Sequence, residues 1–306
     1  MAKECFVPVK ITSKKYADRF VKGEIFMRSL HEFGSWGDIT EKDDKLKNDY
    51  RGDLYSGVTA VFDKPENCGY FRRIQVEKGK QIKNCCLIDE SDIQYFKILS
   101  LYCWEFNETT QQFVLPDRRM AKFGDTAVVI IDFCEFIERY ARALFKRYPK
   151  LITMVDRVKP FDFLKTRWLN PLYCKHESQA YQNELRLAFG ELEKNIFTIG
   201  SGTDNVNSMI MNYDPVILQL GDLSDITVEM SIWEFMAGYL PRGFRCRWPS
   251  NNPPLVPSNF DTTRRWTQQQ MLDYRSIHVR PAYTVDGELQ LEEKMPFVEF
   301  VKRSAI

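Results

Sequence analysis

The sequence predicts an α+β protein with a central, mostly antiparallel sheet flanked by helices. Candidate strands and helices are mixed along the 306 residues without the regular strand–helix alternation of a doubly wound parallel sheet. Hydrophobic residues make up 44% of the chain and aromatic residues 14%, a balance typical of a globular protein with a bulky core. We expect a main α+β domain over residues 1–250, and a linker with a C-terminal extension packed on it over 251–306.

The first thirty residues predict a strand, a helix and a second strand. CFVPVKIT (5–12) has strand composition and ends on Thr12-Ser13, hydroxyl residues that can cap the following helix. In SKKYADRFVKG (13–23) apolar residues recur four apart, and Gly23 ends the helix. EIFMRSL (24–30) then predicts the second strand.

The middle of the chain predicts a long loop, several strands and one long helix. Residues 34–53 are polar and charged, which is typical of a functional loop but equally of a plain surface excursion. FCEFIERYARALFKRY (133–148) predicts an amphipathic helix. Its inward side would consist of Phe136, Tyr140, Leu144 and Tyr148. Further strands are predicted at YSGVTAVF (55–62), CCLID (85–89), YFKILSLYCWEF (95–106), TAVVIIDF (126–133) and MVDRVKPFDFL (154–164).

The last third predicts fewer elements. Residues 215–240 suggest a strand, a turn and a helix. NNPPLVPSN (251–259) is rich in Pro and Asn, so it predicts a linker, and the tail from 260 is expected to be short and partly helical.

AYQNELRLAF (180–189) alternates in the manner of a strand. The odd positions from Tyr181 are mostly apolar, whereas the even positions place Gln182, Glu184 and Arg186 on one face. One interpretation is a solvated outer face on which Glu184 and Arg186 form a weak surface ion pair. The other is a cleft lined by an amide, a carboxylate and a guanidinium.

Charge and composition bear on whether the protein binds nucleic acid or a membrane. The net charge of +1 does not indicate non-specific electrostatic binding to nucleic acid or to an anionic membrane. RGFRCRW (242–248) and TTRRW (262–266) mix Arg with Trp, which suits nucleic-acid contacts but also ordinary surface packing. No apolar run approaches the roughly 20 residues that span a bilayer, so we expect a cytoplasmic protein with reduced cysteines.

The usual catalytic fingerprints are missing from the sequence. There is no GxGxxG, Walker loop, GxSxG elbow or HExxH, and neither the cysteines nor the three histidines have metal-ligand spacing, so no metal is expected. A Cys174–His176 nucleophile pair would need an orienting third group, which nothing in the sequence indicates.

The opening strand–helix–Gly–strand unit and the late Gln-x-Glu strand together resemble the ADP-ribosyltransferase superfamily, specifically the DarT-type toxins that modify nucleic acid. The resemblance implies that Glu184 is the catalytic carboxylate, with Gln182 before it. The first-strand position against the dinucleotide falls on Lys10, followed by Thr12. The middle-strand position falls on Ser100 or Tyr102.

The chain looks still closer to a poorly characterised bacterial family with a Glu/Gln-x-Glu-x-Arg strand, here residues 182–186 after Lys175. FGDTAVVIIDF (123–133) resembles that family's central strand, and the resemblance covers roughly residues 5–230 by scattered positions. Lys10 departs from the superfamily pattern of His or Arg, because an ammonium is a compact point charge without a planar fork. Pyrophosphate contacts remain compatible with it.

The resemblance implies a fold of the ADP-ribosyltransferase type and an enzyme that uses NAD as a substrate. Glu184 would stabilise the ribosyl cation-like transition state, Gln182 would orient the nucleophile, and Arg186 would keep Glu184 ionised. The loop 34–53, with Arg51 and Asp53, would present a nucleic-acid or protein acceptor. The expected role is a bacterial toxin or antiphage effector, with an inhibitory partner and no membrane contact.

Two alternatives belong to other classes. One is a non-catalytic protein that binds a nucleotide or nucleic acid, and the other is an interaction scaffold with no small ligand.

Overall fold

A computed structural model describes residues 5–35, 55–90, 95–107, 109–149, 151–190, 214–239 and 278–304. The two Arg/Trp segments and the predicted linker lie outside these residues. So does most of the predicted loop 34–53, including Arg51 and Asp53.

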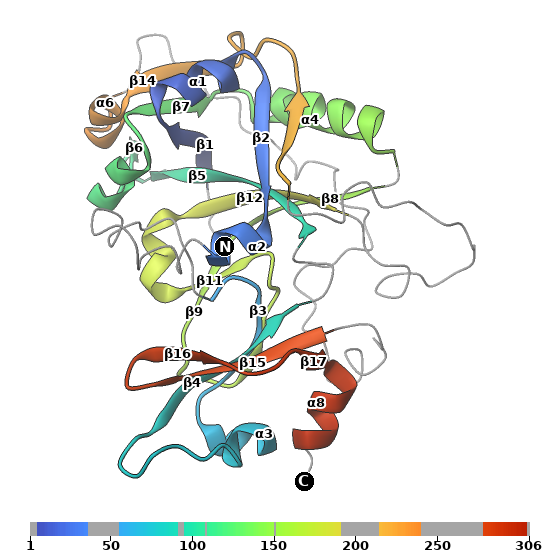
Figure 1. Cartoon of the computed structure of the whole chain (residues 1–306). Coiled ribbons are helices and arrows are strands. Elements are labelled where there is room, and N and C mark those ends of the chain that lie inside the picture. The colour runs from blue at the N-terminus through green and yellow to red at the C-terminus, as the bar shows by residue number, and fades with distance from the viewer. Residues whose placement is uncertain are drawn as a thin grey trace.

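The larger of two main sheets is a nine-stranded, branched sheet in which every pairing is antiparallel. Its main path runs β13 (Val216–Gln219), β2 (Glu24–Ser29), β5 (Lys97–Asn107), β1 (Cys5–Thr12), β7 (Thr126–Ile130) and β14 (Thr227–Ser231). Three strands branch from it: β12 (Glu184–Gly190) and β6 (Gln112–Phe113) pair with β5, and β8 (Ile152–Arg157) pairs with β12. The predicted α+β class with mostly antiparallel strands is confirmed (Figure 1).

Strand β5 is the point at which this sheet branches. On one edge it pairs with β1 over residues 102–106 and with β2 at residues 97–98. On the other edge it pairs with β12 over residues 97–102. Between the β1 and β2 ladders, the Lys10 ammonium donates to the Ser100 carbonyl oxygen at 3.1 Å.

One face of this sheet carries α1 (Lys14–Val21) and α4 (Phe133–Arg147) over the largest apolar cluster. In α4 the predicted Phe136, Tyr140 and Leu144 are buried. Tyr148 lies just beyond α4, is only partly buried and stacks on Phe189 with ring centroids 5.9 Å apart.

The predicted hydroxyl cap at the start of α1 was wrong. Ser13 occupies the N-cap position, but its side chain makes no capping hydrogen bond in the described part of the chain. The Asp125 carboxylate accepts from the Lys14 backbone N–H at 2.7 Å instead. A residue 111 positions away therefore satisfies a donor that the local sequence seemed able to satisfy.

The opposite face carries a second apolar cluster beneath α6 (Ile232–Met236). Ser231 and Glu234 form a capping box at the start of α6. Residues 215–240 were predicted to hold one strand, and they hold two, β13 and β14, before this helix.

The second sheet is six-stranded and antiparallel, and lies below the first in Figure 1. Its order is β10 (Arg167–Trp168), β3 (Val58–Phe62), β4 (Ile82–Asp89), β15 (His278–Val285) and β16 (Glu288–Leu291), with β17 (Met295–Pro296) on β15. The helices α3 (Gly69–Arg72) and α8 (Phe297–Ser304) contact each other and help to build its apolar cluster. The C-terminal part of the chain thus supplies an inner strand of this sheet as well as a helix.

A parallel ribbon of β9 (Lys159–Phe161) and β11 (Cys174–His176) contacts both sheets. The Cys174 thiol donates to the Val58 carbonyl oxygen of β3 at 3.3 Å, whereas the neighbouring Lys175 points to β12. The remaining helices of the described residues are short: α2 (Leu30–Ser35) and the 3₁₀ turns η2 (Pro65–Asn67), η4 (Arg118–Phe123) and η5 (Glu177–Gln182). Among the residues of known placement, no helix has the length and apolar character needed to cross a bilayer.

Gly23 gives a direct test of this packing. Its φ of +86° is in the left-handed region, and an added Cβ would lie 1.9 Å from the Gly221 carbonyl oxygen. Gly79 has a similar φ of +96° but no atom within 4 Å of the added Cβ. We expect Gly79→Ala to lower the free energy of unfolding by about 1 kcal/mol from backbone strain, and Gly23→Ala to lower it by about 3 kcal/mol or more. Urea denaturation of both variants measures the difference, and equal losses would contradict the close approach of Gly23 to Gly221.

Candidate functional site

The strand that carries the candidate carboxylate begins at Glu184, so the predicted strand over residues 180–183 was wrong. Residues 177–182 form η5, and Asn183 adopts a left-handed φ of +37° between the two elements. Asn tolerates this conformation better than most residues. Its side-chain amide donates to the Cys103 carbonyl oxygen, and its own carbonyl oxygen accepts from the Cys103 N–H, both at 2.7 Å.

Glu184 and Arg186 share one face of β12, and that face is buried. Glu184 is 6% exposed and Arg186 is 3% exposed, so the solvated outer face with a weak surface ion pair was wrong. The Arg186 Nε donates to Glu184 Oε1 at 2.7 Å, and its Nη1 donates to the Leu172 carbonyl oxygen at 2.6 Å. The two side chains therefore form a buried, hydrogen-bonded ion pair.

Lys175 of β11 completes this group, and the sequence did not single it out as a site residue. Its ammonium lies 2.6 Å from Glu184 Oε2 and donates to Gln182 Oε1 at 2.5 Å. Gln182 therefore reaches Glu184 through Lys175, and strand alternation plays no part in bringing them together. The only local signal was a lysine placed directly after the apolar residues 172–174.

The two middle-strand candidates separate in the structure. Ser100 and Tyr102 pair across the ladder with Arg186 and Glu184 respectively, so all four side chains start on one face of the sheet. The Ser100 hydroxyl donates to Glu184 Oε1. Tyr102 is buried in the apolar cluster under α6, edge-to-face with Phe235 at 5.8 Å. Ser100 thus contacts the carboxylate, whereas Tyr102 packs in the core.

The first-strand candidates lie farther from the carboxylate. Val9 pairs with Tyr102, so the next residue, Lys10, starts on the sheet face opposite Glu184. The Lys10 ammonium donates to the Ser100 carbonyl oxygen. Thr12 lies at the end of β1, paired with Thr126 of β7. The register therefore does not place Lys10 and Thr12 beside Glu184.

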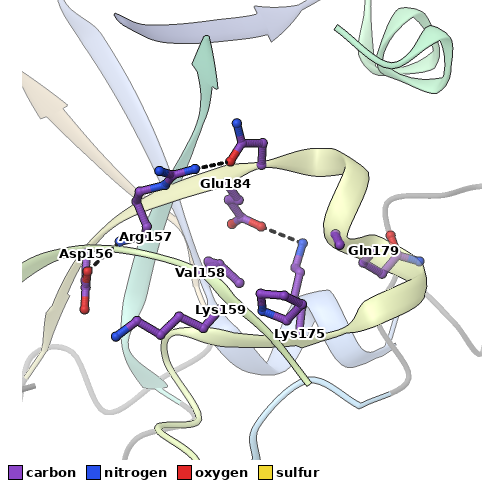
Figure 2. A pocket seen from close by; sticks show the side chains of 10 residues that line it. Asp156, Arg157, Val158, Lys159, Lys175, Gln179 and Glu184 are labelled. Carbon is purple, nitrogen blue, oxygen red and sulfur yellow. Dashed lines mark hydrogen bonds and ion pairs between the residues drawn. The ribbon is translucent and has the colours of Figure 1, made fainter. Parts of the chain in front are cut away.

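Glu184 borders a cavity of about 450 Å³ between the β8–β9 turn and η5 (Figure 2). This volume lies within the range of small-molecule sites. The described lining residues are Asp156, Arg157, Val158, Lys159, Pro160, Lys175, Gln179, Ala180, Asn183 and Glu184. They include three cationic side chains and two carboxylates, so this lining carries a net positive charge.

Arg157 is fixed at one wall of the cavity. Its Nη2 donates to Asn183 Oδ1 and to Glu105 Oε1, both at 2.6 Å, and its guanidinium lies 5.5 Å from the Phe6 ring centroid. Lys159, on the neighbouring wall, is exposed. The cavity thus has one held cation and one solvated cation beside the buried Lys175.

The electrostatics keep Glu184 ionised. Burial alone would raise the pKa of Glu184, but the charges and hydrogen bonds of Arg186 and Lys175 outweigh it and hold that pKa well below its usual range. Glu184 is therefore a fixed negative charge and cannot serve as a proton donor near neutral pH. Together with its two cations it forms a buried group of net charge +1.

The alternative Cys174–His176 pair is not arranged for nucleophilic catalysis. The Cys174 thiol donates to the Val58 carbonyl oxygen, and the His176 Nδ1 lies 2.9 Å from the Ser178 hydroxyl. The His176 ring packs against the aromatic rings of Tyr55, Phe161 and Phe163. In the parts of the chain with known placement, no group of three or more His, Cys, Asp or Glu residues could hold a metal ion.

Comparison with protein-family models, with curated proteins and with solved structures found no match for this chain.

The ionisation of Glu184 predicts a specific acid dependence of stability. Because its pKa is lower in the folded state, its contribution is fully present above about pH 4.5, the ordinary pKa of Glu, and is lost as the pH falls from there toward the folded pKa. We expect the free energy of unfolding to fall by up to about 1.4 kcal/mol per pH unit from this group between pH 4.5 and pH 3. Glu184→Gln removes that part of the slope.

Chemical denaturation between pH 3 and pH 7 measures this difference. At pH 7 the Glu184→Gln variant should itself be less stable by about 3 kcal/mol, because two buried cations lose their partner. An unchanged acid slope in the variant would show that Glu184 is not the group responsible.

Proposed function

We propose that this protein binds NAD in the 450 Å³ cavity and cleaves its nicotinamide–ribose bond, passing ADP-ribose to a nucleic-acid or protein acceptor or to water. The observation that carries the proposal is the position of Glu184, an ionised, buried carboxylate at the wall of a cavity with a cationic lining. The resemblance to ADP-ribosyltransferases supports the same choice of residue.

The proposed chemistry requires a negative charge beside the ribose. As the bond from C1′ to the nicotinamide nitrogen breaks, its electron pair leaves with neutral nicotinamide and positive charge develops on the ribose. An oriented carboxylate in a site of low dielectric stabilises that charge. The acceptor then forms the new bond to C1′ and gives up its proton to solvent.

The neighbours of Glu184 have distinct roles in this proposal. Arg186 and the Ser100 hydroxyl hold Oε1 and fix the orientation of the carboxylate. The proposed role of Gln182 is to orient an acceptor, and its amide donates to Gln179, a residue of the cavity lining. The net positive lining is compatible with the pyrophosphate of NAD.

A second candidate function is nucleotide binding without cleavage. It is favoured by the engagement of both Glu184 oxygens, Oε1 by Ser100 and Arg186 and Oε2 by Lys175. A carboxylate held in this way can order a cationic site instead of stabilising a transition state. The toxin or antiphage role and the inhibitory partner would follow from the resemblance alone.

The test of catalysis is nicotinamide release, detected by mass spectrometry. Purified protein is incubated with NAD alone, and then with DNA, RNA or cell lysate. We expect release by the wild-type chain to fall by about 100-fold or more in Glu184→Gln, the scale expected when one charge-stabilising group is lost. Glu299→Gln, the same change on α8 in the part of the chain that packs on the second sheet, should retain full activity.

The additive that release requires would identify the acceptor class. Absence of release under all four conditions, with NAD still binding, would reject the enzyme and favour the second candidate.

A further inference from the structure

We propose that Lys175 forms an anion subsite of the cavity and binds a phosphoryl oxygen of the ligand, so that the site selects nucleotides over nucleosides. The inference rests on the cavity of the proposed function, but it does not require cleavage. It concerns a residue that neither the sequence motif nor the resemblance assigned to the ligand.

The first argument is the hydrogen-bond capacity of the ammonium. A lysine ammonium has three protons to donate. Within the described structure Lys175 donates one of them to Gln182 Oε1 at 2.5 Å, and its ammonium forms an ion pair with Glu184 Oε2 at 2.6 Å. Lys175 also lines the cavity. The ammonium therefore has donor capacity left for a ligand while it keeps the hydrogen bond to Gln182 and the ion pair with Glu184.

The second argument is charge balance. The described lining of the cavity holds three cations and two carboxylates, and Lys175, which is 7% exposed, is the buried cation among them. Excess charge in a poorly hydrated position is costly unless a counter-charge approaches it. Lys175 lines the cavity, so an anionic ligand there can approach its ammonium, which Figure 2 shows directed at Glu184.

The third argument is preorganisation. The backbone of β11 is fixed by its ladder to β9, where Lys175 pairs with Pro160. The acceptors on either side then hold the ammonium in one place before a ligand arrives. Lys159 also lines the cavity but is exposed, so it is the weaker candidate for a directed contact. Charge-assisted hydrogen bonds from a preorganised donor are among the strong contacts to phosphoryl oxygens.

The experiment is calorimetric titration of wild-type protein, Lys175→Met and Lys175→Arg with ADP-ribose, pyrophosphate and adenosine. ADP-ribose lacks nicotinamide, so binding is measured without turnover. We expect Lys175→Met to weaken ADP-ribose binding by about tenfold or more, with Lys175→Arg recovering part of it. Lys83→Met, the same change at an exposed position of β4, should bind as the wild type does.

A purely structural role for Lys175 predicts a different pattern. It would weaken adenosine and ADP-ribose alike, and circular dichroism would show the loss of fold. Equal ADP-ribose affinity in wild type and Lys175→Met, an equal loss for adenosine, or no ADP-ribose binding by the wild type would each overturn the proposal. If ADP-ribose binding depends on Lys175 but no nicotinamide is released, the anion subsite stands and the enzyme is rejected. If nicotinamide is released and Lys175→Met has the same KM for NAD as the wild type, the enzyme stands and the anion subsite is rejected.

Discussion

The burial of one carboxylate between two cations is the constraint on which the site depends. Transfer of an unpaired carboxylate from water into a protein interior costs several kcal/mol even after relaxation, so a lone Glu184 would take up a proton or move toward solvent. Arg186 on the same strand and Lys175 from the neighbouring ribbon prevent both. Three separate elements must therefore meet before the charge can exist: β12, β11 and, through the Ser100 hydroxyl, β5.

The branched sheet makes that meeting possible. Because β5 carries β1 and β2 on one edge and β12 on the other, a single long strand fixes the register of the site and of the core around it. The same register explains why the first-strand residues of the resemblance do not reach the carboxylate: one position of offset moves Lys10 to the other face of the sheet. The residues of a sequence motif can occur in the expected order along the chain and still lie on opposite faces of the sheet.

Much of the fold could be predicted, because strands and amphipathic helices each produce a regular spacing of apolar residues in the local sequence. α4 and the buried strands β5 and β7 are examples. The misses have local and long-range causes. At Asn183 a single left-handed residue breaks an alternation that looked continuous from 180. The C-terminal strand β15 pairs with β4, almost two hundred residues earlier, and its local pattern gave no sign of that partner.

The candidate site was predictable only in part, for the same reason. Glu184 and Arg186 could be placed together because they are two apart on a strand. Their burial and the presence of Lys175 could not, since both depend on how the β9–β11 ribbon folds back onto β12. Whether these side chains are solvated, or are buried beside cations, depends on tertiary structure.

The ribbon has a structural consequence. Cys174 and Lys175 are consecutive residues that face opposite ways, one bonded to the second sheet and the other to the carboxylate of the first. The contact to the second sheet and the contact to the carboxylate are therefore separated by one peptide unit of β11. The packing of the second sheet and the charged group at the cavity thus depend on the same three-residue strand.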